Sequence, residues 1–139
     1  LAHFRVAIML EEFWLLARQA SAAAPPAPLV SKTLYSWGNN PNGVLGTGDT
    51  LNRSSPTQIG ASSWIMVSAG VSNSIGLGAN RLLYTWGTAG AGVLGNGTTL
   101  GDRSSPIAIG SSSWNYVYAA SNTQYAIRSD GGLFVWGRA

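Results

Sequence analysis

The sequence predicts an all-β repeat protein, and three observations support that fold class. A similar pentapeptide occurs three times, ending in Trp37-Gly38, Trp86-Gly87 and Trp136-Gly137, with a period of roughly 50 residues. A loop with three glycines follows the first two copies. From Lys32 onward, runs of Tyr, Trp, Val and Ile alternate with Gly, Asn, Ser and Pro, which is a β pattern. Such a period is typical of repeat folds, which usually serve as binding or structural modules and less often as enzymes.

The repeat extends well beyond the pentapeptides. The glycine loop Gly43–Gly48 matches Gly92–Gly97, and the segment Arg53–Pro56 matches Arg103–Pro106 after the insertion of one residue near Gly101. The positions to which we assign a structural role in the repeat are Trp37, Gly38, Gly46, Gly48, Pro56, Trp64, Trp86, Gly87, Gly95, Gly97, Pro106, Trp114, Trp136 and Gly137.

Each repeated residue type has an expected purpose. The Trp of each Trp-Gly pair is a wedge that fills the space between neighbouring sheets. The Gly after it allows a sharp turn where a Cβ would clash. Within the loop, Val44 and Leu45 should point inward. The Arg-Ser-Ser-Pro segment should fix the entry into the next strand, because proline restricts itself and the residue before it. Trp64 and Trp114 should form a second aromatic layer.

The strands and turns can be placed from the same pattern. The segments 78–81 and 128–131 occupy equivalent positions and predict hairpin tips, since Gly and Asn tolerate positive φ. The expected strands are residues 33–37, 64–69, 73–77, 82–86, 114–119, 124–128 and 132–136.

The composition restricts the function classes. Only 9% of the residues are charged, against about 25% in an ordinary soluble domain. The formal net charge of +3 arises from scattered arginines and Lys32, and no basic cluster predicts nucleic-acid binding. The absence of cysteine excludes disulfides, zinc ribbons and thiol catalysis. No uncharged stretch is long enough to span a membrane as a helix.

The first thirty residues differ from the rest. Residues 1–20 predict a helical arm, and residues 21–32 form a linker rich in Pro and Ala, because Pro25-Pro26 cannot continue a helix. An anchoring arm is the favoured interpretation. A secretory signal, which Glu11 and Glu12 argue against, and a poorly defined tail are the alternatives. Residues 33–139 hold the repeats.

The motifs resemble the RCC1 repeat family. They are Trp37-Gly38, the loop Gly43–Gly48, Pro56, Ala69-Gly70 and the Asp130–Gly132 hairpin, and the resemblance covers about residues 33–139. The loop departs from the family pattern, with Val44 and Val93 where Gln is usual. The Ser-Ser-Pro and Ser-Ser-Trp segments resemble the repeats of bacterial and phage-borne members.

The resemblance implies a β-propeller. This chain holds two repeats and the opening of a third, too few to close a ring. We therefore expect either a piece of a longer polypeptide, which is favoured, or a propeller completed by association. An open stack would expose an apolar terminal sheet.

The repeats lack the groups that catalysis requires. From residue 33 onward there is no His, Glu or Lys, and the carboxylates are Asp49, Asp102 and Asp130. Asp130 is predicted to serve a turn, and Asp102 to form a solvated pair with Arg103. The glycine loops lack the Lys-Ser/Thr ending of a phosphate-binding loop. We therefore predict no catalytic residue, no cofactor and no metal site.

Two functions remain open. The first is a non-catalytic structural or adhesion module in a virion or surface appendage, which binds protein partners or copies of itself. The second is a cellular regulator that docks a small GTPase or another signalling protein, as the resemblance would allow. An enzyme that uses the repeats as a scaffold is the least favoured. Candidate partner contacts are Phe4, Ile8, Trp14, Leu15, Asn39, Asn40, Asn42 and Arg81.

Overall fold

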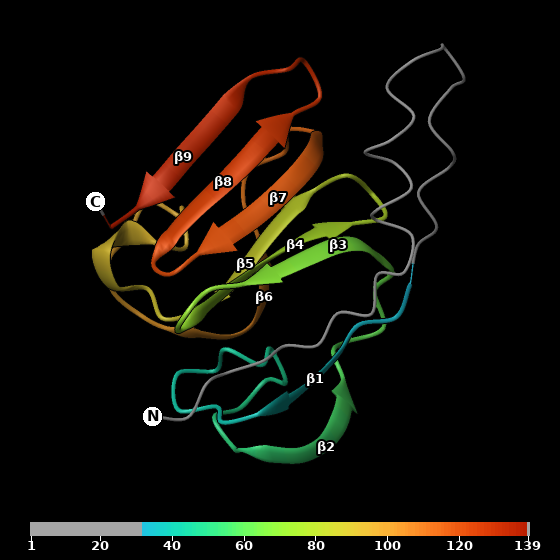
Figure 1. Ribbon diagram of the computed structural model, residues 1–139, viewed down its shortest axis with the longest axis vertical. Coiled ribbons are helices and arrows are strands. Elements are labelled where there is room, and N and C mark those ends of the chain that lie inside the picture. The colour runs from blue at the N-terminus through green and yellow to red at the C-terminus, as the bar shows by residue number, and fades with distance from the viewer. Residues whose placement is uncertain (1–31, 139) are drawn as a thin grey trace.

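Three antiparallel sheets follow one another along the chain (Figure 1), and the computed structural model describes residues 32–138. The first sheet is β1-β2, the second is β3-β4-β5-β6 and the third is β7-β8-β9. The strand bounds are β1 Tyr35–Gly38, β2 Arg53–Gln58, β3 Trp64–Ala69, β4 Asn73–Gly78, β5 Leu83–Gly87, β6 Arg103–Ala108, β7 Trp114–Ala120, β8 Thr123–Arg128 and β9 Leu133–Gly137. The prediction of an all-β protein built from blade-like sheets is confirmed.

The sequence repeat and the sheet are out of phase. The second sheet has four strands, and its third strand β5 carries the Trp-Gly pair. When the repeated residues are aligned, β1 and β2 correspond to the third and fourth strands of the second sheet. In the same alignment, β7 to β9 correspond to its first three strands. One sequence unit, counted from Trp-Gly to Trp-Gly, therefore spans parts of two sheets and joins them covalently.

The seven strands expected from the sequence are present with small shifts at their ends, but two further strands were missed. Arg53–Gln58 and Arg103–Ala108 were expected to lead into a strand, and they are strands themselves, β2 and β6. Their Ser and Pro content disguises them. Each pairs on one side only, with the Trp-Gly strand, and the outer edge of a sheet tolerates a residue without an N–H.

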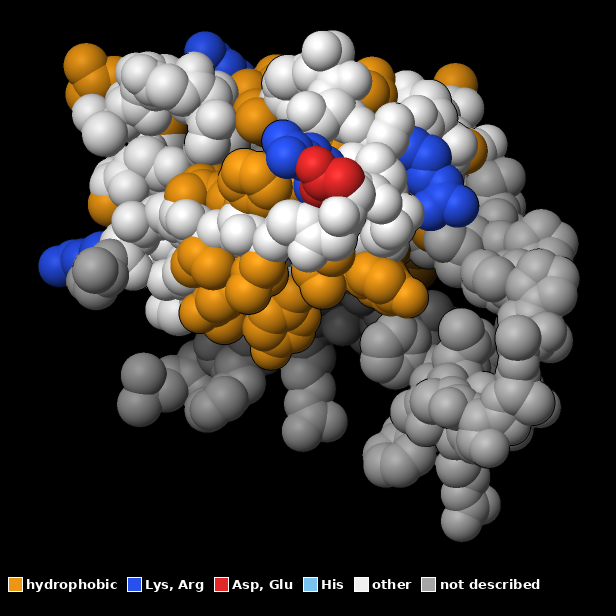
Figure 2. Space-filling view, turned by 90° about the horizontal axis from the view of Figure 1, so that it is seen from above, with side chains coloured by type: hydrophobic (Ala, Val, Ile, Leu, Met, Phe, Trp, Pro, Cys, Tyr) orange, Lys and Arg blue, Asp and Glu red, His pale blue; other side chains and the backbone are white. Residues whose placement is uncertain are grey.

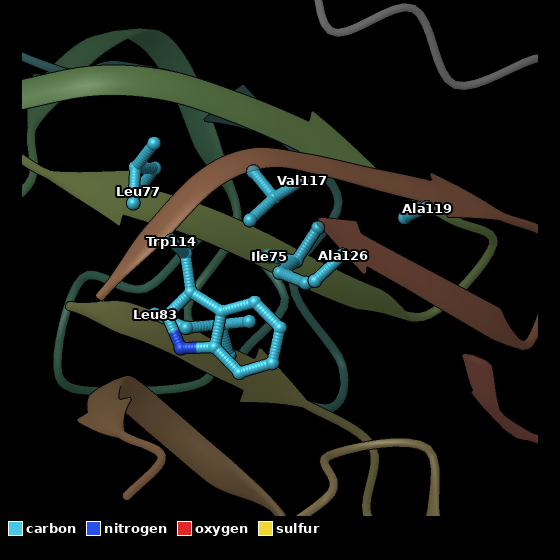
Figure 3. Close-up of a cluster of buried hydrophobic side chains, with 7 residues drawn as sticks. All are labelled: Ile75, Leu77, Leu83, Trp114, Val117, Ala119 and Ala126. Carbon is cyan, nitrogen blue, oxygen red and sulfur yellow. The ribbon is translucent and has the colours of Figure 1, made fainter. Parts of the chain in front are cut away.

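The core lies between the second and third sheets. Side chains of β4 and β5 meet side chains of β7 and β8, and almost none of their surface is exposed (Figure 3). This cluster consists of Ile75, Leu77, Leu83, Trp114, Val117, Ala119 and Ala126. The residues from β7 and β8, apart from Trp114, are small, so the two sheets can approach closely. Burial of this apolar surface holds the sheets together without any ion pair between them.

The Trp residues of the second and third Trp-Gly pairs lie between consecutive repeats. Trp86 Nε1 donates a hydrogen bond of 2.8 Å to the Val44 carbonyl of the preceding loop. The ring is 2% exposed and lies against Gly46, where an added Cβ would come within 2.8 Å of Nε1. Trp136 repeats the contact, donating to the Val93 carbonyl at 3.0 Å. Gly46 and Gly95 are therefore required so that an indole can reach the backbone of each loop.

The glycine that follows each Trp is required by close approach as well as by its backbone angle. Gly87 has φ of 99°, and an added Cβ would lie 2.5 Å from the Ser72 carbonyl oxygen. Gly137 has φ of 113°, with the Asn122 carbonyl oxygen 2.3 Å from the same point. A side chain at either position would be strained and would also push the neighbouring strand away.

The two expected hairpin tips are turns, and the second carries an ion pair. Arg128 Nη2 donates to Asp130 Oδ2 at 2.6 Å, and the guanidinium lies 4.9 Å from the centre of the Phe134 ring. Asp130 Oδ1 also accepts from the Gly132 N–H. The hydrogen bonds from Arg128 and then from Gly132 lower the pKa of Asp130 from its ordinary value of 3.8 to about 2.

The expected helical arm (residues 1–20) and nearly all of the linker (residues 21–32) lie outside the described residues. The boundary near residue 33 consequently stays a prediction. The first described residue, Lys32, forms a bridge with Trp64, exchanging backbone hydrogen bonds of 2.7 and 2.8 Å. The chain entering the first sheet is therefore already attached to the first strand of the second sheet.

Replacing Trp86 with Phe should cost roughly 1–3 kcal/mol of unfolding free energy, because the smaller ring leaves part of the buried indole space empty and the Val44 carbonyl loses one of its two donors. Trp136→Phe breaks the equivalent bond where the ring is only half-buried, so water can replace it and the loss should stay below about 1 kcal/mol. Urea unfolding followed by far-UV circular dichroism measures both losses. Equal losses would contradict a dominant role for the buried wedge.

Removal of the Asp130 carboxylate should change the acid dependence of stability. Because its pKa is lowered from 3.8 to about 2, the ion pair stabilises the fold above about pH 4. That stabilisation is lost as the pH falls through about 2. Asp130→Asn should therefore have a lower melting temperature than the parent at about pH 5, and the two curves should meet near pH 2. A difference that persists unchanged to pH 2 would show that the ion pair is not its cause.

Candidate functional site

The three carboxylates of the repeats serve the structure. Asp49 binds Arg53 Nη2 at 2.6 Å and accepts from the Leu51 N–H, and the hydrogen bond from Arg53 is the main reason that its pKa is lowered. Asp130 holds the hairpin tip described above. Among residues 32–138 no group of three His, Cys, Asp or Glu side chains could hold a metal ion. No arrangement of acids and bases for catalysis is assembled within this part of the chain.

Asp102 differs from its sequence prediction. It does not pair with Arg103, whose guanidinium donates to the carbonyls of Gly101 and of Asp102 itself. The Asp102 carboxylate instead accepts from the Ala89 N–H at 2.9 Å and from Asn42 Nδ2 of the preceding repeat at 3.0 Å. A carboxylate is suited to receive both donors at once, and this contact ties two consecutive repeats together.

The predicted partner contacts separate into two groups. Asn40 is fully buried, and its amide holds its own loop through the Leu45 N–H and the carbonyls of Asp49 and Leu51, so it faces no partner. Asn42 is half-buried and is used by Asp102.

Asn39 and Arg81 remain on the surface. Asn39 is exposed, and half-buried Arg81 lies on the β4–β5 hairpin tip, where its guanidinium reaches the Asn115 side chain at 3.5 Å. Phe4, Ile8, Trp14 and Leu15 lie outside the described residues.

The outer face of the third sheet is the exposed apolar face that the sequence predicts for the last sheet of an open stack, although the sequence analysis did not name its residues. We name it the tyrosine face. Its members lie on one side of β7, β8 and β9, as their pairing register shows: Tyr116, Tyr118, Tyr125, Ile127, Leu133 and Val135. Five of the six are exposed, including Tyr118 at 59% and Leu133 at 65%, and none is charged. Figure 2 looks onto the end of the molecule where β8 and β9 lie and shows hydrophobic side chains gathered there.

The second sheet shows what this face would be like when covered. The equivalent positions there are Met66, Ser68, Ile75, Leu77, Leu83 and Thr85, and the last four are fully buried. Ile75, Leu77 and Leu83 pack against the third sheet, and the Thr85 hydroxyl donates to the Leu94 carbonyl. A contiguous apolar face of this kind is typical of an interaction site. The alternation of Tyr116 and Tyr118 within an expected strand was the sequence signal that could have revealed it, since residues two apart share a face.

The surface also has a small hollow. A shallow hollow of about 210 Å³ lies beside the β4–β5 hairpin tip and is lined by Ser62, Ser63, Gly78, Ala79, Asn80 and Tyr84. No ionisable group except the Tyr84 phenol borders it, so it offers no acid–base pair.

Within residues 32–138, the helical structure is too short to cross a bilayer.

Comparison with known proteins supports the same fold. Residues 33–77 match the family model of the Regulator of chromosome condensation (RCC1) repeat. No curated protein matches the sequence. Human WBSCR16 is similar in structure, with a TM-score of 0.69 and 22% identity over 76% of this chain and 28% of that protein.

Yeast Prp20 is similar in two structures. Prp20p from Saccharomyces cerevisiae, described with its binding to Gsp1p and histones, has a TM-score of 0.68 and 20% identity over 80% of this chain and 29% of its own. The yeast RCC1 (Prp20) complex with Kap60 gives a TM-score of 0.63 and 20% identity over 76% and 28%. The chain thus spans less than a third of the length of these proteins. Its residues 33–77 match the RCC1 repeat model, and its described residues have the fold of RCC1-like propeller blades.

Proposed function

We propose that this chain is a non-catalytic protein-binding module. The observation that carries the proposal is the tyrosine face, which is uncharged and contiguous. Five of its six residues are exposed, although four of the six equivalent residues in the second sheet are fully buried. Tyrosine supplies a large apolar area with little loss of side-chain entropy, and it is enriched at protein interfaces. The carboxylates of the described residues are meanwhile occupied in structural contacts.

The fold similarity agrees with a binding role. The yeast proteins that share the fold are described in complex with Kap60 and with binding properties toward Gsp1p and histones. Blades of this kind present loops and sheet ends to other proteins while the core stays constant. Their identity to this chain is low, so the similarity supports the mode of action and leaves the partner open.

The more specific role that we propose is a structural or adhesion component of a virion or surface appendage. The charged fraction of 9% supports it, because hydroxyls, amides and backbone provide most of the polarity. In this proposal the apolar residues 1–20 anchor the module and the blades carry its contacts. The alternative is a regulator that docks a small GTPase or another signalling protein, for which the shared fold with Prp20 is the supporting observation.

A photocrosslinking phenylalanine analogue at Tyr118 should capture a protein in the source organism, because Tyr118 belongs to the tyrosine face and is 59% exposed on β7. The same analogue at Tyr35, which is 48% exposed on the first sheet, is the matched control. Mass spectrometry of the adducts would identify a signalling protein, a structural neighbour or a second copy. If Tyr118 captures no protein that Tyr35 does not, the tyrosine face is not the binding surface.

Deletion of residues 1–30 should release the module from its assembly, since the apolar arm is the proposed anchor. Sedimentation of the assembly, followed by quantification of the bound and free module, measures the effect. Near-UV circular dichroism shows whether the blades still fold without the arm. Unchanged incorporation of a folded, truncated module would exclude the anchoring role.

A further inference from the structure

The hairpin tips of the second and third sheets share their backbone hydrogen bonds and differ in their side chains. In the β4–β5 tip the Leu82 N–H donates to Asn80 Oδ1 at 3.1 Å. In the β8–β9 tip the Gly132 N–H donates to Asp130 Oδ1, also at 3.1 Å. A backbone N–H of each tip also donates to the carbonyl of the serine that precedes the first strand of its sheet. The two tips can therefore be compared residue by residue.

The tip of the third sheet is filled by its own arginine. The Arg128 guanidinium lies 4.9 Å from the centre of the Phe134 ring, and Asp130 Oδ2 accepts from Arg128 Nη2 at 2.6 Å. The ring is thus covered by a cation, and a carboxylate of the same tip holds that cation in place.

The corresponding tip of the second sheet has neither charge. Gly78 stands where Arg128 stands in the third sheet, and Asn80 stands in place of the carboxylate. The ring is that of Tyr84, and a Cβ added to Gly78 would lie 2.9 Å from its Cε2 atom, so the ring lies against bare backbone. The hollow of about 210 Å³ lies beside this ring. The second sheet has all four of its strands, so the hollow is not left by a missing strand of its own sheet.

The groups that line the hollow are neutral and can form further hydrogen bonds. Asn80 Nδ2 donates one of its two hydrogens to the Tyr84 hydroxyl at 3.0 Å, which leaves its second hydrogen and the phenol hydrogen for a ligand. The exposed Ser62 and Ser63 add hydroxyls that can donate and accept. The lining residues include no carboxylate, lysine or arginine, so a charged ligand would find no opposite charge there.

We propose that this hollow binds one neutral sugar ring, such as the terminal unit of a glycan. Sugar hydroxyls donate and accept hydrogen bonds, as the lining serines and the Asn80 amide do, and sugar C–H groups can pack on the Tyr84 ring. The volume of about 210 Å³ is below the range of about 300–1,000 Å³ that drug-sized ligands occupy, so the hollow accommodates one ring.

The sugar site is separate from the surface that carries the proposed function. It lies at the hairpin tip of the second sheet, whereas the tyrosine face lies on the third sheet. Sugar binding therefore goes beyond the protein-binding role, and either proposal can fail without the other.

The test uses the full 139-residue chain and the methyl glycosides of glucose, galactose, mannose and N-acetylglucosamine as probes. In NMR titrations at least one glycoside should shift the Asn80 side-chain amide and the Ala79 backbone amide, with a Kd in the millimolar range for so small a ligand. N-acetylarginine amide, a cationic probe, should leave both signals unchanged. Shifts with the arginine probe alone, or no shift with any glycoside at about 0.1 M, would overturn the proposal.

Loss of the lining hydroxyls should weaken sugar binding without affecting the fold, because both serines are exposed. In the double variant Ser62→Ala, Ser63→Ala, the Kd of the best glycoside should rise roughly fivefold or more. The double variant Ser112→Ala, Ser113→Ala is the matched control, since these serines hold the equivalent positions before β7, and its Kd should equal that of the parent. Equal Kd values in the two variants would overturn the proposal.

A second pair of substitutions should close the hollow by recreating the tip of the third sheet. In the double variant Gly78→Arg, Asn80→Asp, an arginine can cover the Tyr84 ring as Arg128 covers Phe134. Sugar binding should be lost while near-UV circular dichroism shows the chain to be folded. Binding that persists in the folded variant would place the sugar elsewhere and overturn the proposal.

Discussion

The contact on which the rest of the structure depends is the indole that enters the glycine loop of the preceding repeat. Trp86 reaches the Val44 carbonyl only because Gly46 has no side chain, and the hydrogen bond fixes the distance between the two sheets. Once that distance is set, Ser74 Oγ also reaches the Val44 carbonyl, at 3.0 Å. Two donors from the second sheet thus converge on one backbone oxygen of the first loop, and the stack gains a defined spacing as well as apolar burial.

The seam between the second and third sheets uses a different set of polar contacts. Asn73 donates to the Ser121 carbonyl at 2.8 Å, and Gln124 donates to Asn73 Oδ1 at 3.2 Å. Ser68 Oγ accepts from the Ala119 N–H at 3.0 Å, which brings a strand of one sheet against a strand of the next. Small residues line this seam because a backbone can approach a backbone only where side chains are short.

The sequence predicted the parts of this fold that rest on local chemistry. Trp86, Gly46 and the buried Val44 and Leu45 have the roles expected of them, since an unusual residue type repeated in register has few alternative explanations. β2 and β6 escaped prediction because Ser and Pro have low strand propensity, and their pairing is imposed by the neighbouring strand. Asn40 escaped because an exposed and a buried asparagine look the same in one sequence.

The tyrosine face shows why position in the stack, and not composition, decides which residues are available to a partner. Leu83 and Leu133 occupy equivalent places in two sheets, yet the first is fully buried and the second is 65% exposed, because within residues 32–138 a sheet covers only the first. The faces are also not copies of each other, since Tyr118 stands where Ser68 stands in the second sheet.

That exchange limits what can cover the third sheet. Ser68 is short enough that the Ala119 backbone lies within hydrogen-bonding distance of its hydroxyl. A tyrosine ring at the same place holds any covering backbone farther from the sheet and exposes apolar surface instead of a hydroxyl. A partner of the third sheet must therefore fit the rings of Tyr118 and Tyr125, whose centroids lie 6.2 Å apart, and cannot pack as closely as the third sheet packs on the second.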